Sequence, residues 1–160
     1  MQLVLIIALI IGIADANTLS VCPNGWIAYE GSCYLFGHED NPMTFTAAEQ
    51  YCRQHGGGHL IHVENVQENA FIKDQLRERK PIHWWLGITD EETEGIWKWF
   101  DDDSVATYTD FQPDDHETLD QDCLIFTSVY DFRWADVQCS YKCPPICEIR
   151  SEHIEPGVVG

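Results

Sequence analysis

The segment FQPDDHETLDQDC, residues 111–123, gathers many oxygen-bearing side chains in a short stretch. It holds five acidic residues, two amides and one proline in thirteen positions. Calcium binds six to eight oxygens from carboxylates, amide and backbone carbonyls and water, and this segment offers all of these donors. A second acidic stretch, TDEETEG at residues 89–95, could supply further carboxylates. The two segments therefore predict a calcium site, with a pair of solvated acidic loops as the alternative.

Other residues that could bind a metal or catalyse a reaction form weaker patterns. His59 and His62 lie three residues apart in the apolar segment HLIHV, and on a strand their side chains would point to opposite faces. This spacing argues against a shared zinc ion and favours a structural role or plain exposure. The acidic run Asp101–Asp103 matches no ligand motif and is expected to be a solvated surface.

The sequence also lacks the common enzyme motifs. It contains no Gly-x-Ser-x-Gly elbow, no phosphate-binding Walker loop, no dinucleotide fingerprint and no H-E-x-x-H zinc motif. Carboxylates are so numerous that no pair can be singled out as a glycosidase dyad. We therefore predict that the chain is not an enzyme.

Two helices and several short strands are expected to position the acidic segments. The first helix is predicted within residues 43–58, with Thr44 or Thr46 as N-cap and three glycines at its end. The second is predicted within residues 65–80, where Asn65 and Glu68 have capping-box spacing. Short strands are predicted within residues 26–36 (a hairpin), 59–63, 84–89, 96–100, 123–127 and 146–150. This order indicates one α+β domain, with Trp84, Trp85, Trp97, Trp99 and Trp134 in its core.

The N-terminus and the cysteines indicate export. Residues 3–13 form an apolar run too short to span a bilayer, followed by Ala14-Asp15-Ala16, the small-x-small form of a signal peptidase site. The seven cysteines suit an oxidising compartment and predict three disulfides and one odd thiol. Zinc is the less favoured use of the cysteines, since no paired C-x2-C motif is present. We predict a secreted, extracellular protein.

The charge of the chain excludes some partners. Its 27 acidic and 9 basic residues give a formal net charge of -18, which repels nucleic acids and anionic membranes. No stretch after residue 16 is long and apolar enough for membrane insertion. We expect neither nucleic-acid binding nor membrane insertion.

Six motifs, in order, resemble those of the C-type lectin-like domain, and the secreted single-domain perlucin-like lectins are most similar. They are CPNGWIAYEGSCY, TFTAAEQYC, WWLGITD, QPD, WAD and CEI, which together run from Cys22 to Ile149. The resemblance implies a double-loop α+β fold with two helices, small antiparallel sheets and a long calcium-binding loop. The resemblance implies a lectin domain at 22–150. From the residues outside it we predict a signal peptide at 1–16, a short segment at 17–21 and a flexible tail at 151–160. The implied disulfides are Cys22–Cys33, Cys52–Cys147 and Cys123–Cys139.

The same resemblance assigns roles to the acidic segments. In the family, Gln-Pro-Asp has a cis peptide bond before the proline and turns two side-chain oxygens toward calcium, which implies a cis bond before Pro113. Sugar hydroxyls then bind the same calcium ion. The implied metal ligands are Gln112, Asp114, Asp136, Asp90, Glu94, Asp115 and Asp122. The implied carbohydrate-binding residues are Gln112, Asp114, Gln121 and Asp136.

Two positions depart from the family pattern. Gln121 stands where the family has a glutamate, and Ala135 replaces the asparagine of Trp-Asn-Asp. The second change removes a metal oxygen and a hydrogen-bond donor to the sugar. Asp120 or Glu117 could move into the gap. Galactose-type glycans are weakly favoured over mannose-type by Gln-Pro-Asp.

The resulting functional prediction is a secreted, calcium-dependent C-type lectin that recognises glycans on microbial or self surfaces, as in innate immunity. The alternative is a lectin-like fold whose sugar site has decayed and which binds proteins or mineral. Cys143 is the odd cysteine. It is either a partly buried free thiol or, because Pro144-Pro145 suggests an exposed turn, the bridge of a disulfide-linked homodimer.

Overall fold

The computed structural model describes residues 22–113 and 120–150. The expectations for the signal peptide, for the segment 17–21 and for the tail at 151–160 lie outside these residues. So do those for Asp114, Asp115 and Glu117.

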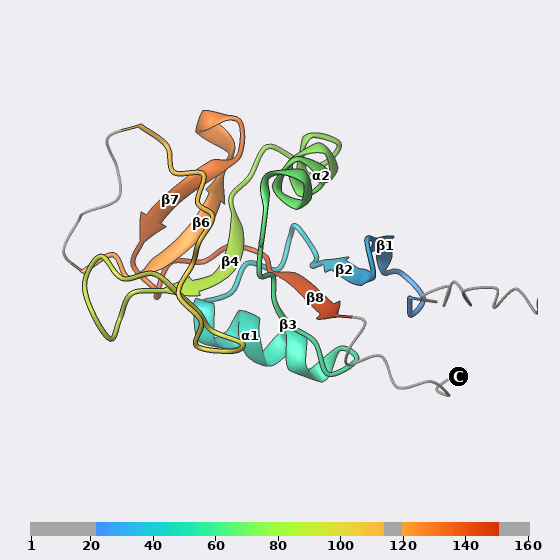
Figure 1. The fold of residues 1–160 in the computed structure, drawn as a ribbon. Coiled ribbons are helices and arrows are strands. Elements are labelled where there is room, and N and C mark those ends of the chain that lie inside the picture. Colours follow the sequence, from blue (N-terminus) through green and yellow to red (C-terminus); the bar gives the residue numbers. More distant parts are fainter. Residues whose placement is uncertain (1–21, 114–119, 151–160) are drawn as a thin grey trace, which may run out of the picture.

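The described residues form two small antiparallel sheets and two helices (Figure 1), which confirms the α+β prediction. The first sheet has the order β1-β2-β8-β3, and the second has the order β5-β4-β6-β7. The strands are β1 Ile27–Tyr29, β2 Ser32–Phe36, β3 His59–Leu60, β4 Trp84–Thr89, β5 Lys98–Trp99, β6 Cys123–Thr127, β7 Arg133–Val137 and β8 Ile146–Arg150. The helices are α1 Phe45–Gln54 and α2 Val66–Arg77, with a short 3-10 turn at Ser128–Tyr130. No helix in the described part of the chain is long and apolar enough to cross a bilayer.

Both helices begin at predicted N-caps. The Thr44 hydroxyl accepts a hydrogen bond from the Ala47 amide, and the Asn65 side chain accepts one from the Glu68 amide. Helix α1 ends at Gln54, shortly before Gly56 and Gly57, which both have positive φ angles. These local signals are readable in the sequence because each involves residues close together in the chain.

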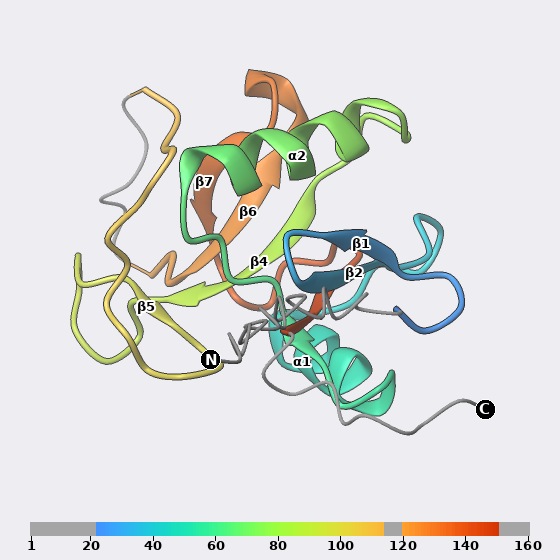
Figure 2. The same cartoon turned by 45° about the vertical axis from the view of Figure 1, so that its right-hand side comes forward.

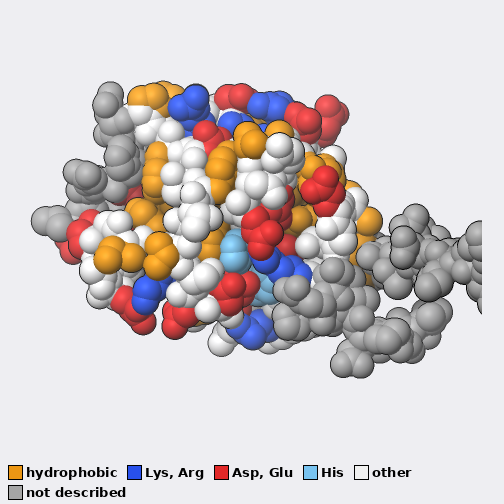
Figure 3. All heavy atoms as spheres, viewed as in Figure 1, with side chains coloured by type: hydrophobic (Ala, Val, Ile, Leu, Met, Phe, Trp, Pro, Cys, Tyr) orange, Lys and Arg blue, Asp and Glu red, His pale blue; other side chains and the backbone are white. Residues whose placement is uncertain are grey.

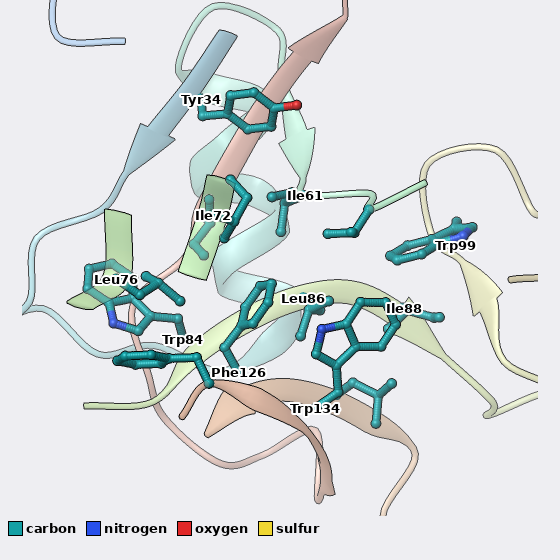
Figure 4. Packing of buried hydrophobic residues seen from close by; sticks show 14 of the residues in the cluster. Tyr34, Ile61, Ile72, Leu76, Trp84, Leu86, Ile88, Trp99, Phe126 and Trp134 are labelled. Carbon is teal, nitrogen blue, oxygen red and sulfur yellow. The ribbon is translucent and has the colours of Figure 1, made fainter. Parts of the chain in front are cut away.

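The core lies on both faces of β4. Trp84 and Leu86 pack with Phe126 and Trp134 on the face toward α2, and Figure 4 shows these side chains together. The intervening Trp85 faces the other way and packs in the cluster that includes α1. Figure 2 shows α2 beside the sheet that contains β4, β6 and β7. The prediction that five tryptophans belong to the core is confirmed, since Trp84, Trp85, Trp97, Trp99 and Trp134 are all buried.

Three disulfides join Cys22 to Cys33, Cys52 to Cys147 and Cys123 to Cys139, the pairs that the family resemblance implies. Cys143 has no disulfide partner in the structure and is buried, with 3% of its surface exposed. The expectation of an exposed turn at Pro144-Pro145 is therefore wrong. The Pro144 carbonyl accepts from the Trp85 amide and the Pro145 carbonyl from the Gly37 amide, which holds this segment inside the fold. A disulfide to a second chain through Cys143 would require the segment to leave the core.

Candidate functional site

One end of the second sheet brings together carboxylates that are far apart in the sequence. Thr89 pairs with Cys123, and Cys123 pairs with Val137. Asp90 directly follows β4, Asp122 directly precedes β6, and Asp136 lies one residue before the end of β7. Antiparallel pairing of the three strands therefore places these three acidic residues at the same end of the sheet.

Asp90 is the most constrained of these residues. It is buried, with 3% of its surface exposed, and its Oδ2 accepts a hydrogen bond from the Gly95 amide at 2.8 Å. Its other oxygen, Oδ1, is also buried but has no hydrogen-bond partner among the described residues. Burial raises the pKa of Asp90; the Gly95 amide opposes this and the nearby Asp122 charge adds to it. A buried carboxylate oxygen without a partner is costly, so this site is suited to a cation.

Glu94 joins the same electrostatic cluster from the exposed loop after β4. Desolvation raises the pKa of Glu94, and the charges of four other acidic residues raise it further. These residues are Asp90, Asp122, Asp136 and Asp120. Asp120, which the sequence suggested as a possible substitute ligand, thus lies within electrostatic range of the predicted ligands. Like charges gathered in this way repel one another unless a cation or a proton joins them.

The segment that carries Gln112 is fixed along the outer edge of β7. The Gln112 amide donates to the Trp134 carbonyl at 2.9 Å, and the Trp134 amide donates to the Asp110 carbonyl at 2.8 Å. The Asp110 carboxylate in turn accepts from Asn69 at 2.8 Å and from Lys73 at 3.0 Å, both on α2. Helix α2 therefore holds the start of the long acidic loop against the strand that carries Asp136.

The structure differs from one detail that the resemblance implies for this loop. No peptide bond among the described residues is cis, so the bond before Pro113 is trans. The trans form is the intrinsically preferred one, by roughly 0.5–1 kcal/mol for a bond that precedes proline.

The departures at positions 121 and 135 have different surroundings. Gln121 is half-buried at the end of the acidic loop, next to Asp122. Ala135 is buried in the apolar cluster that contains Trp85 and Ile125, on the strand position next to Asp136. The Ala135 side chain therefore adds to packing and supplies no oxygen to the sheet end.

The donors at the sheet end are all oxygens, which fits calcium. The described donors are the carboxylates of Asp90, Glu94, Asp122 and Asp136 and the amide of Gln112. No three of these described carboxylates each place an oxygen within 4.8 Å of the other two, so the described ligands do not yet converge on one point. The predicted ligands Asp114 and Asp115 belong to the part of the loop outside the described residues.

A second polar cluster differs from the sequence-based expectations in two details, the opposite faces expected for His59 and His62 and the solvation expected for Asp101; Asp102 and Asp103 are exposed as expected. Strand β3 ends at Leu60, so strict alternation does not extend to His62, and both histidines lie near Asp101. The Asp101 side chain is only 13% exposed and is therefore no solvated acid. Burial acts to raise the pKa of Asp101, but His62 and His59 together hold it below its usual value. Burial lowers the pKa of His59. Asp101 and His62 lie 39 residues apart, so no local sequence signal joins them.

The fold, the disulfides and the acidic sheet end define a C-type lectin domain, and comparison with known proteins gives the same class. The family described as Lectin C-type domain matches residues 41–149. A perlucin-like protein of Mytilus galloprovincialis is 32% identical over 124 residues, which cover 74% of this chain and 76% of that protein. The chain belongs to the C-type lectin family. Membership in this family of non-enzymatic binding modules confirms the prediction that the chain is not an enzyme.

Solved structures with this fold differ in what their descriptions say they bind. The mouse scavenger receptor C-type lectin carbohydrate-recognition domain superposes with a TM-score of 0.73 and 28% identity, covering 84% of this chain and 100% of that one. A calcium-independent type II antifreeze protein superposes with a TM-score of 0.71 and 27% identity, covering 81% and 95%. The fold alone therefore does not decide whether calcium or a glycan is bound.

Proposed function

We propose that this protein is a calcium-dependent glycan-binding lectin whose site lies at the end of the β4-β6-β7 sheet. The observation that carries the proposal is the buried Asp90 carboxylate, whose Oδ1 has no hydrogen-bond partner among the described residues. The Asp122 charge raises the pKa of Asp90, and the charges of Asp90 and Asp122 raise the pKa of Glu94, so the three carboxylates interact. A divalent cation would stabilise all three charges at once.

Calcium would be held by two adjoining groups of ligands. Asp90, Glu94 and Asp122 would form the auxiliary position, with Asp115. Gln112, Asp114 and Asp136 would form the position that meets the sugar. Bound calcium supplies a positive charge with coordination positions open to sugar hydroxyls. Hydrogen bonds would orient those hydroxyls, and the side chains that would make them are Gln112, Asp114, Gln121 and Asp136.

The glycan class follows from the Gln112-Pro113-Asp114 triplet, which in the family resemblance is the galactose-type form. We therefore favour galactose-type over mannose-type glycans. The similarity to a carbohydrate-recognition domain supports glycan binding in general. The three disulfides and the perlucin-like relative support an extracellular location, where a secreted lectin would meet the glycans of microbial or self surfaces.

Retention on immobilised sugars tests this proposal. The oxidised protein is passed over galactose, mannose and N-acetylglucosamine resins, once with calcium and once with a chelator. We expect retention on galactose that the chelator abolishes, and an Asp136→Asn variant should elute with the unbound fraction. An Asp103→Asn variant, changed in an exposed acid outside the predicted ligands, is the matched control and should be retained.

A second function is favoured by Ala135, whose side chain packs in an apolar cluster and offers no oxygen. In this case the sugar position has decayed and the acidic surface binds proteins or mineral. The structural similarity to a calcium-independent antifreeze protein shows that proteins with this fold occur without calcium dependence. Retention on none of the three resins, together with a calcium-induced rise in the melting temperature, would favour this second function over the first.

A further inference from the structure

A compact group of nitrogen and oxygen donors lies between β3 and the turn that follows β5. His62 Nδ1 is 3.2 Å from Asp101 Oδ1 and 4.0 Å from Asp102 Oδ2. One donor atom from each of these three residues lies within 4.8 Å of the other two. Among the residues that the structure describes, no other group of three histidine, cysteine or acidic side chains is this close. The group shares no residue with the predicted calcium site.

The backbone of Gly87 fixes this arrangement. The Gly87 amide donates to the Ile61 carbonyl at 2.9 Å, and the Gly87 carbonyl accepts from the Phe100 amide at 2.8 Å. A Cβ atom at position 87 would lie 2.5 Å from the Leu60 carbonyl oxygen, so only glycine allows this close approach. The segment with His62 and the turn with Asp101 are therefore held on either side of the same residue.

Packing and hydrogen bonds orient two of the donors. The Trp99 ring is stacked on the His62 ring, with centroids 4.1 Å apart and an interplanar angle of 15°. Asp102 Oδ1 accepts from the Ser104 amide at 2.9 Å. The other oxygen of Asp102, Oδ2, is the one nearer His62.

His59 provides a fourth donor and an independent observation. Its Nδ1 lies 2.8 Å from the Leu60 carbonyl, which can only accept, so Nδ1 carries the proton and Nε2 has the lone pair. Nε2 is buried without a hydrogen-bond partner in the described part of the chain. It lies 3.8 Å from Asp101 Oδ2, too far for a hydrogen bond. A metal-binding histidine commonly donates its other ring N–H to a backbone carbonyl in this way.

We propose that His62, Asp101 and Asp102 bind a zinc ion, and that the His59 ring, which lies outside this group of three, moves toward it to supply the fourth ligand. Tetrahedral zinc with bonds of about 2.0–2.2 Å places its ligand atoms roughly 3.3 Å from one another. The separations of 3.2 Å from His62 to Asp101 and 4.0 Å from His62 to Asp102 need a small contraction, which the half-exposed Asp102 can make through Oδ2, the oxygen not bonded to Ser104. His59 Nε2 lies 3.8 Å from Asp101 but more than 4.8 Å from at least one other donor, so its ring has farther to move. Two neutral imidazoles and two carboxylates would balance the charge of the ion. Imidazole donors favour zinc over calcium, which prefers oxygen.

A surface pocket gives the ion a route to the group. It has a volume of about 260 Å³, and its lining includes His62, Trp99, Asp102 and Ser104. Figure 3 shows histidine side chains that reach the molecular surface between acidic ones. The bound ion would connect the turn after β5 to the end of β3 and so fix the start of the loop that leads to the acidic segment.

The test is a calorimetric titration of the untagged, oxidised, metal-free protein with zinc in a large excess of calcium, which fills the oxygen sites. We expect one saturable zinc equivalent, and cobalt in place of zinc should give the visible absorption of a tetrahedral complex. No saturable binding, or a cobalt spectrum of an octahedral ion, would overturn the proposal.

Variants locate the ion. Asp101→Asn and Asp102→Asn should each weaken zinc binding by roughly tenfold or more. Because Asp102 is half exposed, its variant tests the proposal even if substitutions at His62 or Asp101 prevent folding. Asp103→Asn and His55→Gln, which change exposed residues outside the group, should bind zinc as the unaltered protein does. Equal weakening in these controls, or none in Asp102→Asn, would contradict the assignment.

Discussion

Glu148 and Asp90 are both almost completely buried carboxylates, with 1% and 3% of their surface exposed, but their surroundings differ. Glu148 accepts hydrogen bonds from the Ser32 hydroxyl at 2.9 Å and from the His62 amide at 3.0 Å. The Arg150 Nε lies 3.2 Å from the same carboxylate. Asp90 accepts from the Gly95 amide, and among the described residues it has no ion-pair partner.

The neighbouring charge with the largest effect on the pKa acts in opposite directions at the two carboxylates. Burial raises the pKa of Glu148 to about 8, and the Arg150 guanidinium acts to lower it. At Asp90, burial also raises the pKa, but the neighbouring charge, on Asp122, raises it further. The first sheet therefore contains a buried acid with its own internal cation. The end of the second sheet contains a buried acid that has no such cation among the described side chains.

The largest expected effect is loss of the internal cation. Above about pH 8, where the buried Glu148 is ionised, Arg150→Met should lower the free energy of unfolding by about 3 kcal/mol, because it leaves that charge without its partner. Unfolding in denaturant, with and without calcium, measures this. The double variant Glu148→Gln with Arg150→Met should recover part of the loss, since no buried charge then remains. If calcium restores the stability of Arg150→Met, then calcium can replace the internal cation of Glu148, and the claim that only the Asp90 region takes an external cation is wrong.

The next largest effect is expected from calcium, the cation that we propose binds at Asp90. Calcium at one hundred times its dissociation constant should raise the free energy of unfolding by about 2.7 kcal/mol. Asp90→Asn should remove this gain and, in a chelator, should be at least as stable as the unaltered protein because a buried charge is gone. Thermal unfolding of both proteins in both conditions gives the comparison. An Asp90→Asn variant that is still stabilised by calcium to the same extent would place the ion elsewhere.

A smaller effect is expected from the support behind the site. Asp110→Ala removes the carboxylate that joins Asn69 and Lys73 to the segment of Gln112, at a cost of about 1–2 kcal/mol. Calcium affinity should also fall, although no proposed ligand has changed. Calorimetric calcium titration of this variant checks the point, and unaltered affinity would show that α2 does not support the site.

The smallest effect is expected at an exposed ion pair. Arg77 contacts Asp74 and Asp131 on the surface, and Arg77→Ala should change the free energy of unfolding by less than about 1 kcal/mol. Calcium affinity should stay the same. Unfolding in denaturant measures the change in stability. A larger loss in the free energy of unfolding would mean that exposed ion pairs also contribute strongly to stability, so that the comparison of the buried Glu148 and Asp90 would not single out the charges that matter.

Features that depend on neighbouring residues could be predicted from the sequence, and those that depend on distant pairing could not. The helix caps Thr44 and Asn65 are local and were predictable. Strand β7 was not predicted as a strand, since its stability comes from pairing with β6 across a tight turn. That turn contains Asp131 and Phe132, which both have positive φ angles.

The candidate sites follow the same division. The sequence shows that the acidic loops can supply oxygen ligands, because residue type alone identifies carboxylates. The burial of Asp90 could not be predicted in this way, because it depends on how the strands pair in the sheet. The His62–Asp101 pair was missed because the close contact of Gly87 with Leu60 brings the two residues together. The exposed turn expected at Cys143 was wrong because two proline carbonyls accept backbone hydrogen bonds from distant amides. Burial also raises the pKa of the Cys143 thiol, which disfavours reaction with a second chain.

The most direct test of the account is calorimetric titration of metal-free protein with calcium, performed on the unaltered chain, on Asp90→Asn and on Glu148→Gln. The account predicts saturable calcium binding to the unaltered chain and strong weakening in Asp90→Asn. It predicts little change in Glu148→Gln, because the carboxylate that this change removes already has an internal cation. Absence of saturable binding to the unaltered chain, or weakening in Glu148→Gln equal to that in Asp90→Asn, would contradict it.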